Sequence, residues 1–250
     1  MIKNGRGLLE EEVRVDYNTA KYNMKETRET RDMIERLWAE RTNGNARLFN
    51  ASKFRLAGHG PSQEGGVFEL RVGVTDYKDH VGTNLSPDVQ KYIGEGDTKV
   101  YRLTEAFYVV QVKIFQFDLM SQCVGVGCWV TTTDGMVVFV ENAAWKGEQA
   151  CKVDRPGGHT EPSECVGETG DAETMARIPP TEVRRELFDC IRREVRDEVN
   201  IATELQSQPE LLGILYNHER GGRLCRFWEL EKNNTDLDNF SPGFPDPMQR

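Results

Sequence analysis

The 250-residue chain contains no long hydrophobic run, and its 32 Lys and Arg are outnumbered by 41 Asp and Glu. No uninterrupted apolar stretch is long enough to cross a bilayer. The first residues lead into Glu10-Glu11-Glu12 without the apolar segment of a secretory signal. The net charge of -9 argues against nucleic acid or an anionic membrane as the main partner. We therefore expect a cytoplasmic or nuclear protein that binds neither.

The chain also has no C-x2-C pair, the spacing found in many zinc sites and redox motifs. In the absence of a secretory signal, the six cysteines are expected to be reduced thiols, and no zinc site is expected.

Carboxylates are concentrated in residues 181–201, a segment with helical periodicity. Glu194, Asp197 and Glu198 fall within an arc of roughly 100° on one flank. An apolar stripe lies next to them and consists of Val183, Leu187, Ile191, Val195 and Val199. Carboxylates beside a core repel one another unless a cation joins them, and a divalent cation takes such oxygen ligands. The other interpretation at this point is a solvated acidic face.

A glycine turn lies upstream of this helix. Pro156-Gly157-Gly158 is followed by Glu164, six residues after Gly158. This segment and residues 193–201 match the two halves of the pattern G-x5-E-x7-R-E-U-x-E-E-x-G-U, the Nudix box, in which U is aliphatic. Asp197 replaces the first Glu of the E-E pair. Asn200 replaces the last Gly, which a left-handed helix end tolerates.

The box is also split, because residues 165–192 separate its halves where the pattern has seven positions. With this split, the chain resembles the Nudix hydrolase superfamily and, within it, the nucleoside diphosphate-linked moiety X motif 22 branch. Further matching segments extend the resemblance from about residue 35 to about residue 230, and they are residues 48–56, 74–79, 82–84, 124–127 and 211–214.

The resemblance implies an α+β fold, the Nudix α/β/α sandwich with a mixed sheet between helices, preceded by an N-terminal α/β extension. It implies an enzyme that uses Mg²⁺, with Mn²⁺ as the alternative, to hydrolyse the diphosphate bond of UDP-glucose or UDP-galactose to UMP and a sugar 1-phosphate. The expected partner is thus a small nucleotide sugar. The alternatives are a Nudix hydrolase for another nucleoside diphosphate derivative, such as ADP-ribose, and an inactive nucleotide-binding relative.

The resemblance also implies roles for the residues of the box. Glu194 and Glu198 would be the main metal ligands, and Glu198 is the candidate for activating water. Asp197 would bind the cation directly or lie one layer further out. The backbone carbonyl of Gly158 would add another oxygen, which accounts for a glycine at a close approach.

A salt bridge between Glu164 and Arg193 would tie the glycine loop to the helix. These two residues, Glu194 and Glu198 form the expected catalytic set. The inserted residues leave the pairing open, and Glu186 is a second candidate partner for Arg193.

Substrate-binding residues are expected in the N-terminal region. Lys53 and Arg55 share one face of a predicted strand, where two cations could meet a diphosphate. Asn50 lies in the same segment, and Tyr77 and Asn84 could frame a uracil or ribose. The alternatives are a strand whose cations face water and a Tyr77 that packs in the core.

The remaining pattern predicts the arrangement of elements along the chain. Residues 1–20 are expected to be a loose arm, 30–41 a helix and 165–180 a surface loop. The predicted strands are residues 49–56, 67–74, 124–132, 136–142, 211–217 and 224–230. Residues 181–201 form the catalytic helix, with Thr181 as its N-cap.

The expected domains are an N-terminal substrate-recognition region, residues 1–100, and a Nudix domain, residues 119–232, with the box at 158–201. Residues 233–250 are expected to be a disordered or aberrant tail, and residues 105–118 are strand-like outside the resemblance. A final Nudix strand and helix have no counterpart in this sequence, which suggests a shortened family member with exposed apolar surface.

Overall fold

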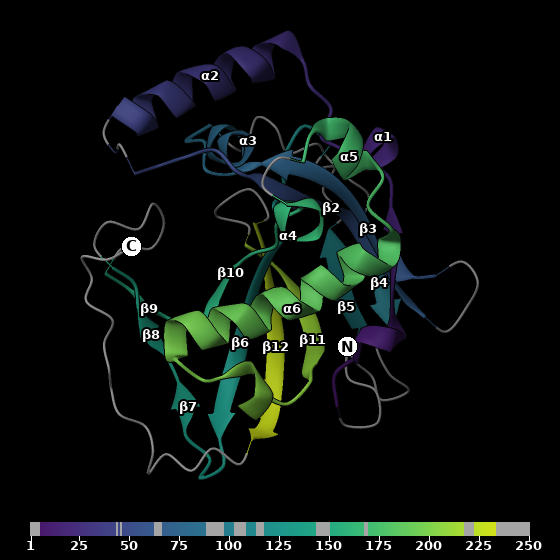
Figure 1. Ribbon diagram of the computed structural model, residues 1–250. Helices are drawn as coiled ribbons and strands as arrows, with labels where there is room; N and C mark the ends of the chain where they lie inside the picture. The colour runs from purple at the N-terminus through teal and green to yellow at the C-terminus, as the bar shows by residue number, and fades with distance from the viewer. Residues whose placement is uncertain are drawn as a thin grey trace.

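The computed structural model describes residues 6–43, 45, 47–62, 67–88, 98–102, 109–113, 118–143, 151–167, 170–217 and 223–233. These residues form a mixed α/β structure of small sheets and several helices (Figure 1). No described helix is both long and apolar enough to span a membrane. Of the predicted tail, residues 233–250, Asn233 is the last residue of a strand and residues 234–250 lie outside the described part of the chain.

The first sheet has three strands in the order β1-β3-β2, and they are β1 (Val13–Tyr17), β3 (Phe68–Asp76) and β2 (Ser52–Pro61). β2 and β3 pair antiparallel, so the predicted strands at 49–56 and 67–74 form a hairpin. β2 extends past its predicted end because a register shift between Leu56 and Gly58 lets pairing continue to Pro61.

The predicted loose arm is wrong for most of residues 1–20. A 3-10 turn, η1 (Glu10–Glu12), leads into β1, which pairs parallel to β3, and α1 (Thr19–Tyr22) follows. Val13 and Val15 alternate with Arg14 and Asp16, so one face of this short strand is apolar. Val13 is fully buried there.

The main strands of the second sheet have the order β10-β6-β12-β11, and a short strand, β7, pairs with β6. Their bounds are β10 (Gly157–His159), β6 (Gly125–Thr132), β12 (Arg223–Asn233), β11 (Pro209–Asn217) and β7 (Val137–Val138). β12 is parallel to β6 and the other pairs are antiparallel, so the sheet is mixed. Asp134 and Gly135 form a tight turn between β6 and β7, in which the Thr132 N–H donates to the Met136 carbonyl at 2.9 Å and Gly135 has φ 85°.

Two further ladders each have two strands, and they pair β4 (Thr98–Arg102) with β5 (Val109–Lys113) and β8 (Val140–Glu141) with β9 (Val153–Asp154). β5 accounts for part of the strand-like segment at 105–118. Residues 105–108 and 114–117 of that segment lie outside the described residues.

The predicted catalytic helix is α6 (Pro180–Val199), and it lies across one face of the second sheet (Figure 1). Its N-cap is Pro179 and not Thr181, because Pro180 at the first helical position has φ already suited to a helix. The helix ends at Asn200, which is left-handed with φ 59°, as its place in the box predicts.

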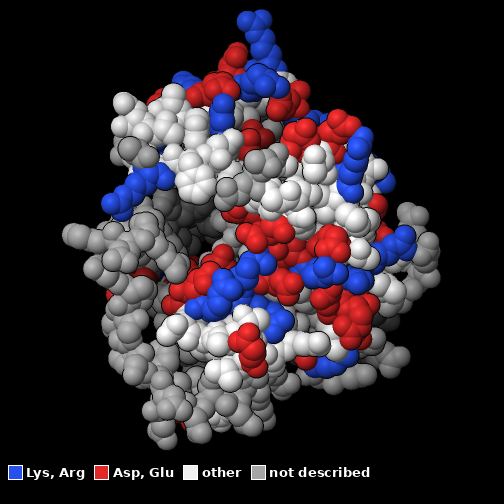
Figure 2. Space-filling view, in the orientation of Figure 1, with Lys and Arg blue, Asp and Glu red and all other residues white. Residues whose placement is uncertain are grey.

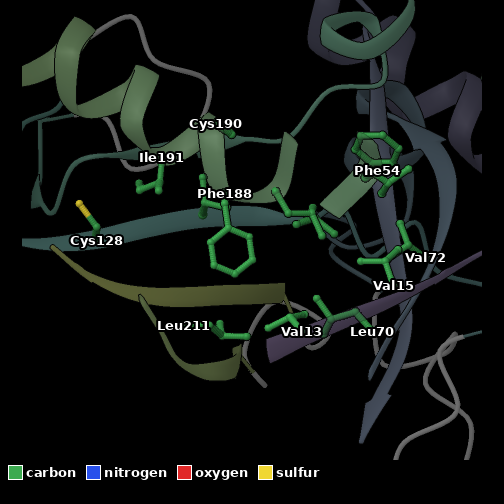
Figure 3. Close-up of a cluster of buried hydrophobic side chains, with 14 of the residues drawn as sticks. Val13, Val15, Phe54, Leu70, Val72, Cys128, Phe188, Cys190, Ile191 and Leu211 are labelled. Carbon is green, nitrogen blue, oxygen red and sulfur yellow. The ribbon is translucent and has the colours of Figure 1, made fainter. Parts of the chain in front are cut away.

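One hydrophobic core joins the two sheets and α6 (Figure 3). Val15, Phe54 and Val72 come from the first sheet, whereas Phe188 and Ile191 come from α6. Side chains from both predicted domains, residues 1–100 and 119–232, pack in this one core. The division of the chain into these two domains stays a prediction.

The insertion predicted as a surface loop is mostly exposed where the structure describes it, but it contains α5 (Ala172–Ala176) and the end of α4 (Ser163–Val166), so the prediction of a loop without helices is wrong. Ile178 is buried in the core, and the Tyr17 hydroxyl donates to the Met175 carbonyl at 2.7 Å. The segment therefore packs against β1. Its polar composition gave no indication of these contacts.

The predicted N-terminal helix is α2 (Arg28–Asn43), which packs on α3 (Tyr77–Gly82). A Cβ on Gly82 would lie 2.5 Å from Ile34 Cγ1, so glycine permits this approach.

Asp79 of α3 and Asp76, the N-cap of this helix, give a pH prediction. Burial and the neighbouring Asp76 raise the pKa of Asp79 from 3.8 to about 6. The folded protein therefore binds this proton more tightly, and stability is lost as pH rises from about 4 to about 6. Asp79→Asn is expected to raise the free energy of unfolding at pH 7 by about 1–3 kcal/mol. Urea unfolding at pH 4 and pH 7 measures this, and an equal effect at both values would contradict it.

Candidate active site

Two glycines of β10 lie against two carboxylates of α6. The Gly157 N–H donates to Glu198 Oε2 at 3.0 Å. A Cβ on Gly158 would lie 1.9 Å from Glu194 Oε1, so no larger residue fits with that carboxylate in place. β10 is fixed by its antiparallel pairing with β6, in which Gly158 faces Val126. The two halves of the split box therefore meet in space.

The carboxylates differ in their surroundings. Glu194 and Glu198 are half-buried, one helical turn apart, whereas Asp197 is exposed. The Asp197 carboxylate accepts two hydrogen bonds from Arg196, at 2.8 and 3.1 Å. Figure 2 shows acidic side chains interleaved with basic ones over α6, and a hollow above the left-hand end of this helix.

The donor set of this site suits a hard cation. Carboxylate oxygens of Glu194 and Glu198 and the backbone carbonyl of Gly158 are the kind of ligand that Mg²⁺ takes. Across the described residues, no group of three or more His, Cys, Asp or Glu side chains could hold a metal. A cation here would thus need water and substrate phosphate to complete its shell.

Arg193 contacts both acids proposed for it. Its Nη2 lies 2.8 and 2.7 Å from the two oxygens of Glu186, and its Nε lies 3.7 Å from Glu164 Oε2. Glu186 is buried, and this burial raises its pKa to about 7 although the hydrogen bonds from Arg193 act in the opposite direction. Glu164 is half exposed.

Lys53 and Arg55 share a face of β2, as strand alternation predicts, but that face is buried. Lys53 is 6 % exposed and Arg55 is 3 % exposed, so the alternative of two cations facing water is wrong. Lys53 forms an ion pair with Glu161. Arg55 donates to the carbonyls of Met120 and Tyr22 at 3.0 and 2.7 Å, and burial lowers its pKa to about 10.

The other predicted substrate residues lie around α3. The side chain of Asn50 donates to Asp76 at 2.9 Å and accepts from the Lys78 N–H at 2.8 Å, which ties the segment before β2 to this helix. Asn84 is fully buried, and its Oδ1 accepts from the Gln122 N–H at 2.9 Å.

Tyr77 belongs to a row of rings that leads to the site. Its ring lies 6.3 Å from that of Trp38 on α2 and 6.1 Å from that of His80. The His80 ring lies 5.9 Å from that of His159, the residue after Gly158. His80 and Glu161 are not predicted from the sequence, and only the i, i+3 spacing of Tyr77 and His80 on α3 could have indicated His80.

Two carboxylates of α6 lie against a glycine strand, and Arg193, one residue before Glu194, lies between two acids. This is the arrangement that the split Nudix box predicts. No protein-family model matches the chain. Comparison with curated proteins does show similarity over most of it.

Over 225 residues the chain is 32 % identical to uridine diphosphate glucose pyrophosphatase NUDT22 of Bos taurus, a match that covers 87 % of this chain and 70 % of that protein. It is 31 % identical over 228 residues to the protein of that name from Homo sapiens, covering 88 % and 68 %. It is 29 % identical over 192 residues to Nudix hydrolase 9 of Arabidopsis thaliana, covering 73 % and 57 %. The chain belongs to the Nudix hydrolases, is an enzyme of that family, and resembles the NUDT22 proteins within it.

Proposed function

We propose that the chain hydrolyses the diphosphate bond of UDP-sugars and releases UMP and a sugar 1-phosphate. The contact of Gly157 and Gly158 with Glu198 and Glu194 carries the proposal, because it unites the split box in one site. The names of the similar bovine and human proteins support UDP-glucose as a substrate.

Glu194, Glu198 and the carbonyl of Gly158 would hold a divalent cation, Mg²⁺ or Mn²⁺. When bound, such a cation neutralises charge on the phosphate oxygens. Glu198 is our candidate for accepting the proton of the attacking water. Asp197 would support the site directly or one layer out, while its contact with Arg196 favours the outer position.

Arg193 and Glu164 belong to the catalytic set as the residues that hold the loop on the helix. Because an arginine between two acids has its charge already paired, Arg193 acts on geometry rather than on substrate charge.

The recognition of the nucleotide sugar is proposed for the N-terminal region, residues 1–100. Asn50 is exposed and Tyr77 is half-buried, so these two are the better candidates for direct contact. Lys53, Arg55 and Asn84 are buried, so they would support the residues that contact the substrate rather than contact it themselves. We also propose that the fold is an α/β/α sandwich, in which α6 forms one helical layer.

Product analysis with a substrate panel tests the function. Purified protein is incubated with UDP-glucose, UDP-galactose or ADP-ribose, with and without Mg²⁺, and products are separated by chromatography. We expect UMP and sugar 1-phosphate from both UDP-sugars, only with the cation. Turnover confined to ADP-ribose would favour the alternative Nudix substrate, and binding without turnover of any substrate would favour an inactive relative.

A further inference from the structure

Arg193 has a buried partner that lies outside both halves of the Nudix box. Glu186 is 5 % exposed and meets Arg193 Nη2 with both carboxylate oxygens, at 2.8 and 2.7 Å. It precedes Arg193 by seven residues, or two helical turns, and thus lies on the same face of α6. Glu164, the acid that the box supplies, is half exposed and 3.7 Å away.

The same carboxylate also reaches the loop. Glu186 Oε1 accepts a hydrogen bond from the Glu161 N–H at 3.3 Å, two residues after the end of β10. The Glu161 side chain is paired with the buried Lys53 of β2. Glu186 therefore joins α6 to the glycine strand and, through Glu161, to the first sheet.

The backbone fixes the position of this loop in register with β2. The Phe54 N–H donates to the Thr160 carbonyl at 3.1 Å, and the Thr160 N–H donates to the Val124 carbonyl at 3.2 Å. These bonds hold the loop against strands, but they do not reach α6. In the segment after β10, the Glu161 N–H reaches α6 through Glu186, beside the longer contacts of Glu164 with Arg193 and of the Cys165 thiol with the Glu182 carbonyl.

We propose that Glu186 is the positioning residue that sets α6 against the glycine strand, a task that the split box leaves only partly to Glu164. The insertion explains why Glu186 can take this position. Because α6 starts at Pro180, well before the second half of the box, its first turns carry a partner for Arg193. Loss of the carboxylate would let Gly158 shift relative to Glu194. The catalytic consequence rests on the proposed function, but the link between loop and helix does not.

Hydrogen exchange measures the link without any substrate or cation. In Glu186→Gln, backbone amides of residues 157–164 are expected to exchange about tenfold faster than in the wild-type protein, because the Glu161 N–H keeps only a neutral acceptor and the charged contact with Arg193 is lost. Glu182→Gln is the matched control, because Glu182 lies one turn earlier on α6 and pairs with the exposed Arg185. Exchange in the control is expected to equal that of the wild-type protein.

Kinetics measure the consequence. Glu186→Gln is expected to lower kcat for UDP-glucose about 10- to 100-fold, as is typical when a supporting partner of a metal site is removed, with KM changed less than about threefold. Glu164→Gln is expected to cost less, because its contact is longer and more exposed. The double variant Glu186→Gln with Arg193→Gln should lose less than the product of the two single losses, because both single variants remove the same contact between these side chains.

Wild-type exchange at residues 157–164 together with wild-type kcat in Glu186→Gln would overturn the proposal. If the wild-type protein hydrolyses no UDP-sugar, the proposed function fails, and the exchange result still decides the role of Glu186. Should Glu186→Gln not fold, Glu186→Asp replaces it. Its shorter stem cannot reach both Arg193 and Glu161, so the same acceleration is expected and its absence rejects the proposal.

Discussion

Replacement of either glutamate of the candidate site is expected to remove turnover while the fold is kept. Glu194→Gln and Glu198→Gln should each lower kcat for UDP-glucose on the order of 10³-fold, because each removes a charge that would hold the cation opposite the developing phosphate charge. Gln has nearly the same shape as Glu and both side chains are half-buried, so packing is little affected. In Glu198→Gln the Gly157 N–H keeps an acceptor oxygen, although a neutral one.

Steady-state kinetics and thermal unfolding test this pair of variants together. Asp189→Asn is the control, because Asp189 lies on the same helix, is partly exposed, and pairs weakly with Arg192 at 4.0 Å. It should keep wild-type kcat, as its contact lies outside the site. Undiminished turnover in Glu194→Gln or Glu198→Gln would remove that residue from the proposed catalytic set.

The sequence predicted the parts of the site that depend on local structure. α6 follows from an apolar stripe with helical spacing, and the same periodicity places Glu194 and Glu198 on one flank. The glycine strand follows from the motif itself. The meeting of the two across residues 165–192 followed from the resemblance alone, since no local pattern reports which distant segment a helix packs on.

The parts that the sequence did not predict depend on distant partners. β1 has five residues, and its parallel partner β3 begins only at Phe68, so no turn or hairpin marks it. The burial of Arg55 depends on carbonyls of Tyr22 and Met120, which have no sequence pattern. Its spacing with Lys53 was read correctly, yet spacing gives the face of a strand and not what covers it.

Gly158→Ala is expected to reduce turnover about 10²-fold with little change in stability. The added Cβ would lie 1.9 Å from Glu194 Oε1, at the free end of a flexible side chain, so the carboxylate moves and the backbone does not need to. A displacement of about 1 Å at a reacting centre is enough for such a loss. Gly157→Ala should instead lower the stability of the fold. Its Cβ would lie 2.3 Å from the carbonyl oxygen of Val126, a backbone atom that cannot move without disturbing β6.

The contrast between the two glycines separates catalysis from folding within one dipeptide. Thermal unfolding should show a clear loss of stability for Gly157→Ala, on the order of 1–3 kcal/mol for an overpacked backbone contact, and a much smaller one for Gly158→Ala. Gly213→Ala in β11 is the control, because nothing lies within 4 Å of a Cβ at that position. Wild-type kcat in Gly158→Ala would mean that the Glu194 carboxylate tolerates displacement, and it would therefore contradict the role of this contact in setting the metal ligand.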